Sequence, residues 1–276
     1  MLTDHSYGLP RPRPLALPPA GTLYLDAVLA STVFDLDATI AASYPGSGQT
    51  WANLTAAPAD GSAQAAYDFY RGGTAAAHTD DPTFNGTPGD PAAYWSVDGA
   101  DFWRLAGAKT AFLNALHKTT DGSNFWLALA LRWVTSANGL FGTANASSST
   151  GMNLRSNTNG AFTFRQYGSA QVAYTSATGL LVNGEDSLLI LSYDHASHTL
   201  AHWVDTRTAT TTTMNFNTTT ADAAGAGEIF TRGDGSFCMS AGARLYGCAM
   251  GHEYLDNTKA GLIIDHLNAR HGRTYA

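Results

Sequence analysis

The most informative part of the chain is residues 37–54, which read DATIAASYPGSGQTWANL. Tyr44 precedes a proline, and that position favours an extended backbone over a helical one. Gly46 and Gly48 follow at once and can adopt backbone angles that are closed to other residues. The segment therefore predicts a strand that ends in an aspartate, then a tight turn, then a return to the core anchored by Trp51.

Short segments with strand character, separated by turn residues, continue to near the end of the chain. Residues 33–37 alternate in the period-2 manner of a half-buried strand. Residues 125–134 are apolar on both faces, so we expect a central strand there, and the threonine-rich residues 208–220 suit an edge strand. Regular short strands and frequent turns predict a sandwich or a barrel. The other expected elements are turns at 157–160 and 195–198, helices at 108–118 and 258–270, and a last strand pair at 238–239 and 245–250.

The expected C-terminal helix has signals at both of its ends. Asp256 or Asn257 can cap its N-terminus with a side-chain oxygen. Gly272 stands just beyond its last turn, where a glycine commonly ends a helix. The side chains expected to dock the helix on the rest of the fold are Leu262, Ile263 and Leu267.

Two later segments add to the pattern of residues 37–54. Residues 94–102 read YWSVDGADF, and residues 268–272 read NARHG. In this order, the three segments resemble the concanavalin A-like (laminin-G-like) jelly-roll domains of phage tail, fibre and head-spike proteins. The resemblance implies an all-β fold: a concanavalin A-like jelly-roll β-sandwich with a short internal helix and a C-terminal helix. We expect residues 23–276 to form this sandwich, and the proline-rich residues 1–22 to form an arm that is either an anchor or disordered.

The composition argues against several classes of protein. Of the 276 residues, 13% are charged, the net charge is −7, and lysine and arginine do not cluster along the sequence. Nucleic-acid binding needs such clusters to neutralise phosphates. The chain has no apolar run of about 18 residues that would predict a membrane span, and residues 1–20 lack the features of a secretory signal. Cys238 and Cys248 either pair across a hairpin or, as we favour, remain two small buried hydrophobes.

The sequence lacks the commonest pattern of a catalytic site. Glycosidases with this jelly roll place paired carboxylates on one strand, often as Glu-x-Asp-x-x-Glu. The glutamates of this chain are Glu185, Glu228 and Glu253, and none of them lies in that pattern. We therefore expect a protein that is not an enzyme and holds no cofactor. Calcium is the one ion that lectin-like jelly rolls often bind, with Asp98 and Asp101 as candidates, but a side-chain cap of the turn by Asp98 is favoured.

Aromatic side chains supply the candidate ligand site. Sugars stack on flat aromatic rings, while short polar side chains bind their hydroxyl groups. Trp95, Trp103 and Tyr70 lie beside turns and polar neighbours, and we expect them to be exposed. The turn that follows Trp95 brings Asp101 and Arg104 to the same place. These five residues form the predicted carbohydrate site.

The resemblance implies attachment to a host cell. The sandwich would bind cell-surface carbohydrate, and the arm would seat the protein on other subunits of a virion or phage-like particle, as a tail fibre, a head spike or a part of a gene transfer agent. Such a surface protein would be made in the bacterial cytoplasm without a signal peptide, with no nucleic-acid partner and no membrane insertion. Two alternatives remain: a secreted or surface adhesin lectin, and a polysaccharide hydrolase or lyase.

Overall fold

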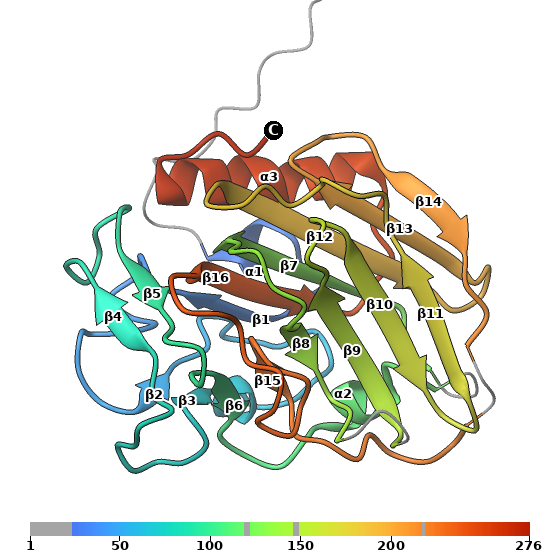
Figure 1. The fold of residues 1–276 in the computed structure, drawn as a ribbon, viewed down its shortest axis with the longest axis horizontal. Helices are drawn as coiled ribbons and strands as arrows, with labels where there is room; N and C mark the ends of the chain where they lie inside the picture. Colours follow the sequence, from blue (N-terminus) through green and yellow to red (C-terminus); the bar gives the residue numbers. More distant parts are fainter. Residues whose placement is uncertain (1–23, 119–121, 146–148, 217–218) are drawn as a thin grey trace, which may run out of the picture.

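A computed structural model describes residues 24–118, 122–145, 149–216 and 219–276 of the chain. In these residues, two antiparallel β-sheets lie face to face, and a helix near the C-terminus covers the outer side of one sheet (Figure 1). This architecture confirms the predicted all-β, concanavalin A-like sandwich with a short internal helix and a C-terminal helix. The arm expected at residues 1–22 lies outside the described residues. Among the described helices, none has the length and apolar character needed to cross a membrane.

Within the described ranges, each sheet has eight strands. The first sheet is ordered β14-β13-β12-β7-β16-β5-β4, and β1 also pairs with β16. Its strands are β1 (Thr32–Asp37), β4 (Thr83–Asn85), β5 (Tyr94–Ser96), β7 (Phe125–Arg132), β12 (Asp186–Asp194), β13 (Thr199–Val204), β14 (Thr210–Thr213) and β16 (Arg244–Gly251).

The second sheet is ordered β11-β10-β9-β8-β15-β6-β3-β2. Its strands are β2 (Thr50–Trp51), β3 (Phe69–Arg71), β6 (Trp103–Leu105), β8 (Gly139–Gly142), β9 (Gly151–Ser156), β10 (Phe162–Tyr167), β11 (Gln171–Thr175) and β15 (Glu228–Ile229). The helices are α1 (Leu25–Val28), α2 (Ala111–Ala115) and α3 (Asn257–His271), with a 3₁₀ turn, η1 (Gln64–Tyr67).

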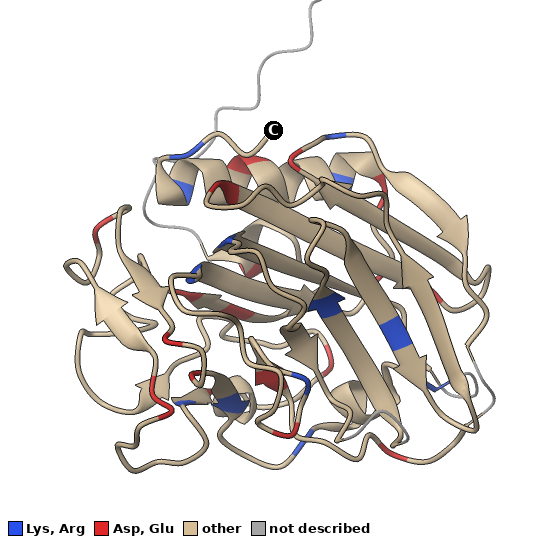
Figure 2. Ribbon diagram, viewed as in Figure 1, with Lys and Arg blue, Asp and Glu red and all other residues tan. Residues whose placement is uncertain are grey.

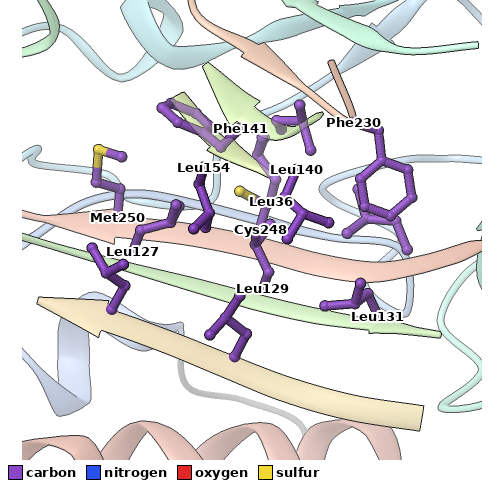
Figure 3. Packing of buried hydrophobic residues seen from close by; sticks show 14 of the residues in the cluster. Leu36, Leu127, Leu129, Leu131, Leu140, Phe141, Leu154, Phe230, Cys248 and Met250 are labelled. Carbon is purple, nitrogen blue, oxygen red and sulfur yellow. The ribbon is translucent and has the colours of Figure 1, made fainter. Parts of the chain in front are cut away.

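Strand β7 is buried on both of its faces. It lies between β12 and β16 in the first sheet, which confirms the prediction that residues 125–134 form a central strand. Leu127, Leu129 and Leu131 point toward the second sheet (Figure 3). The side chains between them point the other way, toward α3; they belong to Trp126, Ala128 and Ala130. Apolar residues at consecutive positions are therefore required, as is usual for a strand covered on both sides.

The turns and helix ends follow the local sequence signals. Residues 157–160 join β9 to β10, and residues 195–198 join β12 to β13. Of the threonine-rich residues 208–220, Thr210–Thr213 form β14, which lies at the edge of the first sheet as expected. Asp256 caps α3 by accepting a hydrogen bond from the Lys259 amide, and Gly272 ends the helix with a φ of 59°.

An aromatic cluster joins two of the segments that carry the resemblance. Tyr44 and Trp51 come from residues 37–54, and Trp95 comes from residues 94–102. The ring centroids of Tyr44 and Trp95 lie 4.5 Å apart, and those of Trp51 and Trp95 lie 5.6 Å apart. All three rings are buried. The Tyr-Pro-Gly-Ser-Gly turn therefore serves to fold the chain back so that these rings can pack between the sheets.

A buried charge network joins residues 37–54 to the third segment, residues 268–272. Arg270 donates hydrogen bonds to both carboxylate oxygens of Asp35 and to Asp37, all at 3.0 Å, and His271 lies 2.9 Å from Asp37. Burial acts to raise the pKa of Asp37, but His271 and Arg270 beside it hold that pKa far below its usual range. Strand β1, predicted to be half-buried, is fully buried because α3 covers these acidic side chains.

Several local predictions are corrected by the structure. Residues 238–239 form no strand beside β16, because the chain from 231 to 237 crosses β8 instead, with Gly139 donating to the Phe237 carbonyl. Leu262 is 39% exposed, and the residues that dock α3 are Ala260, Ile263, Ile264 and Leu267. The helix expected at 108–118 is confined to α2.

The two cysteines are unpaired. Cys248 is buried in the core between the sheets, and burial raises the pKa of its thiol. Cys238 is only partly buried and lies in the segment that precedes Ser240. The favoured alternative of two small buried hydrophobes is therefore confirmed for Cys248 and wrong for Cys238, which is only partly buried.

Candidate functional site

The two tryptophans of the predicted ligand site are buried. Trp95 and Trp103 are each 0% exposed, and their rings meet edge to face with centroids 5.8 Å apart. Neither ring has a free face on which a sugar could stack, so the prediction that they are exposed is wrong. Their polar sequence neighbours misled the prediction, because in a strand the polar and apolar residues alternate between opposite faces.

Of the other three predicted residues, Tyr70 and Arg104 are cross-strand neighbours, and Asp101 accepts a hydrogen bond within its own turn. Asp101 is 3% exposed, and its carboxylate accepts a hydrogen bond from the Asp98 amide at 2.9 Å. Burial raises the pKa of Asp101 to about 7. Tyr70 and Arg104 lie opposite each other on β3 and β6, on the outer face of the second sheet. A ligand-binding role for these three residues stays a prediction.

The turn at Asp98 is capped in the way that the sequence favoured. Its carboxylate accepts a hydrogen bond from the amide of Ala100 at 2.9 Å, which is the local turn that an aspartate commonly forms. Across the parts of the chain that the structure describes, no group of three or more His, Cys, Asp or Glu side chains is placed to hold a metal ion.

A hollow of about 160 Å³ opens on the outer face of the second sheet, and we call it the arginine hollow. Its floor comes from β8, β9 and β10, and its sides come from the chain before β8 and the chain after β15. The residues that line it are Ala137, Asn138, Gly139, Asn153, Arg155, Arg165, Tyr167, Arg232 and Phe237.

Strand alternation explains why the floor is polar. The side chains between these positions, such as Leu154 of β9 and Phe164 of β10, point into the core. Asn153 and Arg155 of β9 therefore point outward, and the antiparallel register places Asn153 directly opposite Arg165 of β10. Figure 2 shows the basic positions of β9 and β10 side by side on neighbouring strands.

One wall of the arginine hollow exists because β8 carries glycines. A side chain on Gly142 would overlap the carbonyl oxygen of Arg232, and one on Gly139 would overlap the backbone of Thr231. The segment 231–237 can therefore lie directly on the outer face of β8. It brings Arg232 to the hollow, with the guanidinium carbon 4.7 Å from the centroid of the Phe237 ring.

Arg104 helps to fix the segment 231–237, which forms this wall, through a contact with Glu228. Its Nε donates to Glu228 Oε1 at 2.6 Å, and the other oxygen of Glu228 accepts from the amide of Gly235 at 2.8 Å. Glu228 is buried on β15, and its burial raises the pKa of the carboxyl. Arg104, predicted as a ligand residue, thus acts in the structure through Glu228 to fix the segment that forms the wall.

The arginine hollow is rich in donors that lack partners. The Nε atoms of Arg155, Arg165 and Arg232 and the Nδ2 atom of Asn153 are buried, and none of them has a hydrogen-bond partner among the described residues. Leaving a buried donor unsatisfied costs about 1–3 kcal/mol. Burial, and then the neighbouring Arg165, lower the pKa of Arg155. Asp234 pairs with Arg232 at 2.5 Å, but the described residues that line the hollow include no Asp or Glu.

Solved structures share this fold at low sequence identity. The binding domain of botulinum neurotoxin DC, in complex with SialylT, aligns with a TM-score of 0.58 and 10% identity, over 87% of this chain and 52% of its own. Trypanosoma rangeli sialidase in complex with sialic acid aligns with a TM-score of 0.53 and 13% identity, over 87% of this chain and 33% of its own. This chain therefore spans about half of the first protein and a third of the second. No protein-family model matches the chain, and no curated protein sequence is significantly similar to it.

The sequence contained part of the signal for the arginine hollow. Arg155 and Arg165 stand at outward-facing positions on the two strands joined by the turn at 157–160. In a chain with only 15 basic residues, two arginines on the same face of one hairpin are an informative pattern. A search for basic residues clustered along the sequence misses it. Arg232 could not be found in this way, because only the path of the chain over β8 brings it to the hollow.

Proposed function

We propose that this protein binds carbohydrate and that the arginine hollow is its binding site. The observation that carries the proposal is the set of four buried side-chain donors without partners in one hollow. A sugar ring presents many acceptor oxygens, which would satisfy these donors. The volume is similar to that of engineered cavities of about 150 Å³ that admit a benzene ring, so one six-membered ring is the expected occupant.

The comparisons add support at the level of the fold. The two aligned proteins are described as complexes with SialylT and with sialic acid, and this chain shares the fold of a part of each, which supports carbohydrate as the class of ligand. The rim of the hollow also carries Phe237, which is 51% exposed and can pack against the apolar face of a sugar.

Binding is proposed in preference to catalysis. Glycoside hydrolysis generally needs two carboxyl groups about 5–10 Å apart on either side of the scissile bond. The described residues that line the arginine hollow provide no carboxyl group. A polysaccharide hydrolase or lyase would therefore need a site elsewhere on the molecule, and a secreted or surface adhesin lectin remains an alternative setting for the same binding activity.

The proposed biological setting is the surface of a virion or phage-like particle, where the sandwich would attach the particle to a host-cell glycan. This part of the proposal rests on the resemblance carried by residues 37–54, 94–102 and 268–272, and on the proline-rich residues 1–22 as an anchor. Deleting residues 1–22 should abolish incorporation into particles while glycan binding is kept. Normal incorporation of the shortened protein would contradict an anchoring role.

A glycan array tests the binding proposal. The wild-type protein should bind a restricted set of glycans and release no product from them. Phe237→Ala should weaken that binding, because it removes the exposed ring at the rim of the hollow. Leu262→Ala is the matched control, since Leu262 is an exposed apolar residue on α3, which covers the other sheet. Absence of glycan binding, or equal loss in both variants, would overturn the proposal.

A further inference from the structure

The arginine hollow has an excess of positive charge that the described residues lining it do not balance. Arg155 and Arg165 are diagonal neighbours across β9 and β10, on the same outward face. Only Arg232, of the three lining arginines, forms an ion pair with a carboxylate among the described residues, through Asp234. Among the described residues, the one acceptor that Arg155 reaches is the carbonyl of Ala137, at 3.4 Å. Like charges at this spacing disfavour the empty site unless an anion joins them.

The shape of the guanidinium group limits which anion would satisfy the pair. Arginine offers a planar fork of N–H donors that matches the two oxygens of a carboxylate. A neutral sugar could accept hydrogen bonds here, but it would leave the repulsion between Arg155 and Arg165 in place. We propose that the arginine hollow selects a sugar that carries a carboxylate, a uronic acid or a sialic acid, with Arg155 and Arg165 holding that carboxylate between them. This inference rests on the proposed carbohydrate-binding function.

The remaining lining residues fit the uncharged part of such a sugar. Asn153 is 3% exposed, lies opposite Arg165, and has a free amide donor for a hydroxyl or ring oxygen. Phe237, at the rim, offers an apolar surface. The wall formed by residues 231–237 closes one side of a hollow that admits about one ring. The site therefore suits one acidic residue of a glycan at a time.

The test compares the wild-type protein with a double variant, Arg155→Gln with Arg165→Gln, on an array that carries carboxylated, sulfated and neutral glycans. Arg207→Gln is the matched control, because that guanidinium is exposed and pairs with Asp265 on α3. The bound carboxylated glycans are also printed as their methyl esters, which removes the charge and keeps the ring. A second variant, Arg165→Lys, keeps the charge and removes the fork.

The wild-type protein and the Arg207→Gln control should bind carboxylated glycans. Neither should bind the methyl esters of the same glycans. The double variant should bind them about tenfold to a hundredfold more weakly, as expected for the loss of charge-assisted hydrogen bonds. Its thermal unfolding temperature should not fall, because two unbalanced charges are removed. Arg165→Lys should also bind more weakly than wild type.

Each other outcome separates the two proposals. Binding to neutral glycans that the double variant retains would overturn the carboxylate inference and leave the carbohydrate-binding function standing. If the wild-type protein binds sulfated glycans or the methyl esters as tightly as it binds carboxylated glycans, the proposed contact between the guanidinium groups and a carboxylate would be overturned. Failure of the wild-type protein to bind any glycan would overturn the proposed function itself.

Discussion

At the scale of single residues, the arginine hollow depends on positions that carry no side chain. Gly142 lies under the backbone of Arg232, and the space between them admits no Cβ atom. Gly142→Ala should therefore displace the segment 231–237, lower the free energy of unfolding by about 1–3 kcal/mol, and weaken glycan binding by moving Arg232. Urea unfolding and calorimetric titration with a bound glycan measure the two effects.

The control for this prediction is Gly107→Ala. An added Cβ at Gly107 would meet no atom within 4 Å, so both stability and affinity should stay near those of the wild-type protein. If Gly142→Ala binds glycans as the wild-type protein does, the wall formed by residues 231–237 is not part of the binding site.

The burial of Trp95 and Trp103 explains why the sequence predicted the wrong aromatic residues for the ligand site. Trp95 and Trp103 were expected at the surface because their neighbours are polar, but the side on which a strand meets the core depends on the opposite sheet. Arg104 lies on the outward face of β6, and its partner Glu228 lies 124 positions away in sequence. A contact between residues so far apart in sequence produces no periodic pattern, so it can be identified only in the folded structure.

At the scale of elements, local signals were sufficient for much of the fold. The apolar run at 125–134 predicted a central strand, and Asp256 and Gly272 marked both ends of α3. These predictions succeeded because strand burial and helix capping depend on adjacent residues. The segment 231–237 lacks such a signal, since it is held by glycines of another strand and by Glu228.

Helix α3 should detach from β1 more readily in acid, because Asp37 joins the two elements. Its folded pKa lies far below the unfolded value of about 3.9. A lowered folded pKa means that Asp37 contributes its full stability above the unfolded pKa, and that this stability is lost as the pH falls below it. We therefore compare how far the free energy of unfolding falls between neutral pH and about pH 3. This fall should be larger for the wild-type protein than for Asp37→Asn.

Urea unfolding of both proteins at a series of pH values measures this difference. At neutral pH, Asp37→Asn should already be the less stable protein, because Arg270 and His271 lose a charged partner. Asp265→Asn is the control, since Asp265 forms an exposed pair with Arg207 and such pairs contribute about 0–1 kcal/mol. Parallel pH curves for wild type and Asp37→Asn would show that this network does not govern acid stability.

At the scale of the whole molecule, a net charge of −7 opposes the approach of an anionic glycan, while the arginine hollow attracts it at short range. Salt screens the long-range repulsion strongly and the contacts inside a partly buried site much less. Raising the salt concentration should therefore have two opposing effects that largely cancel. We expect the affinity for a carboxylated glycan to change by less than about tenfold between about 50 and 200 mM salt, whereas a protein that neutralises 6–10 nucleic-acid phosphates loses about 10³–10⁵ over that range. Titration calorimetry at several salt concentrations measures the slope. A steep loss of affinity would mean that a broad basic surface, and not the enclosed hollow, makes the contact.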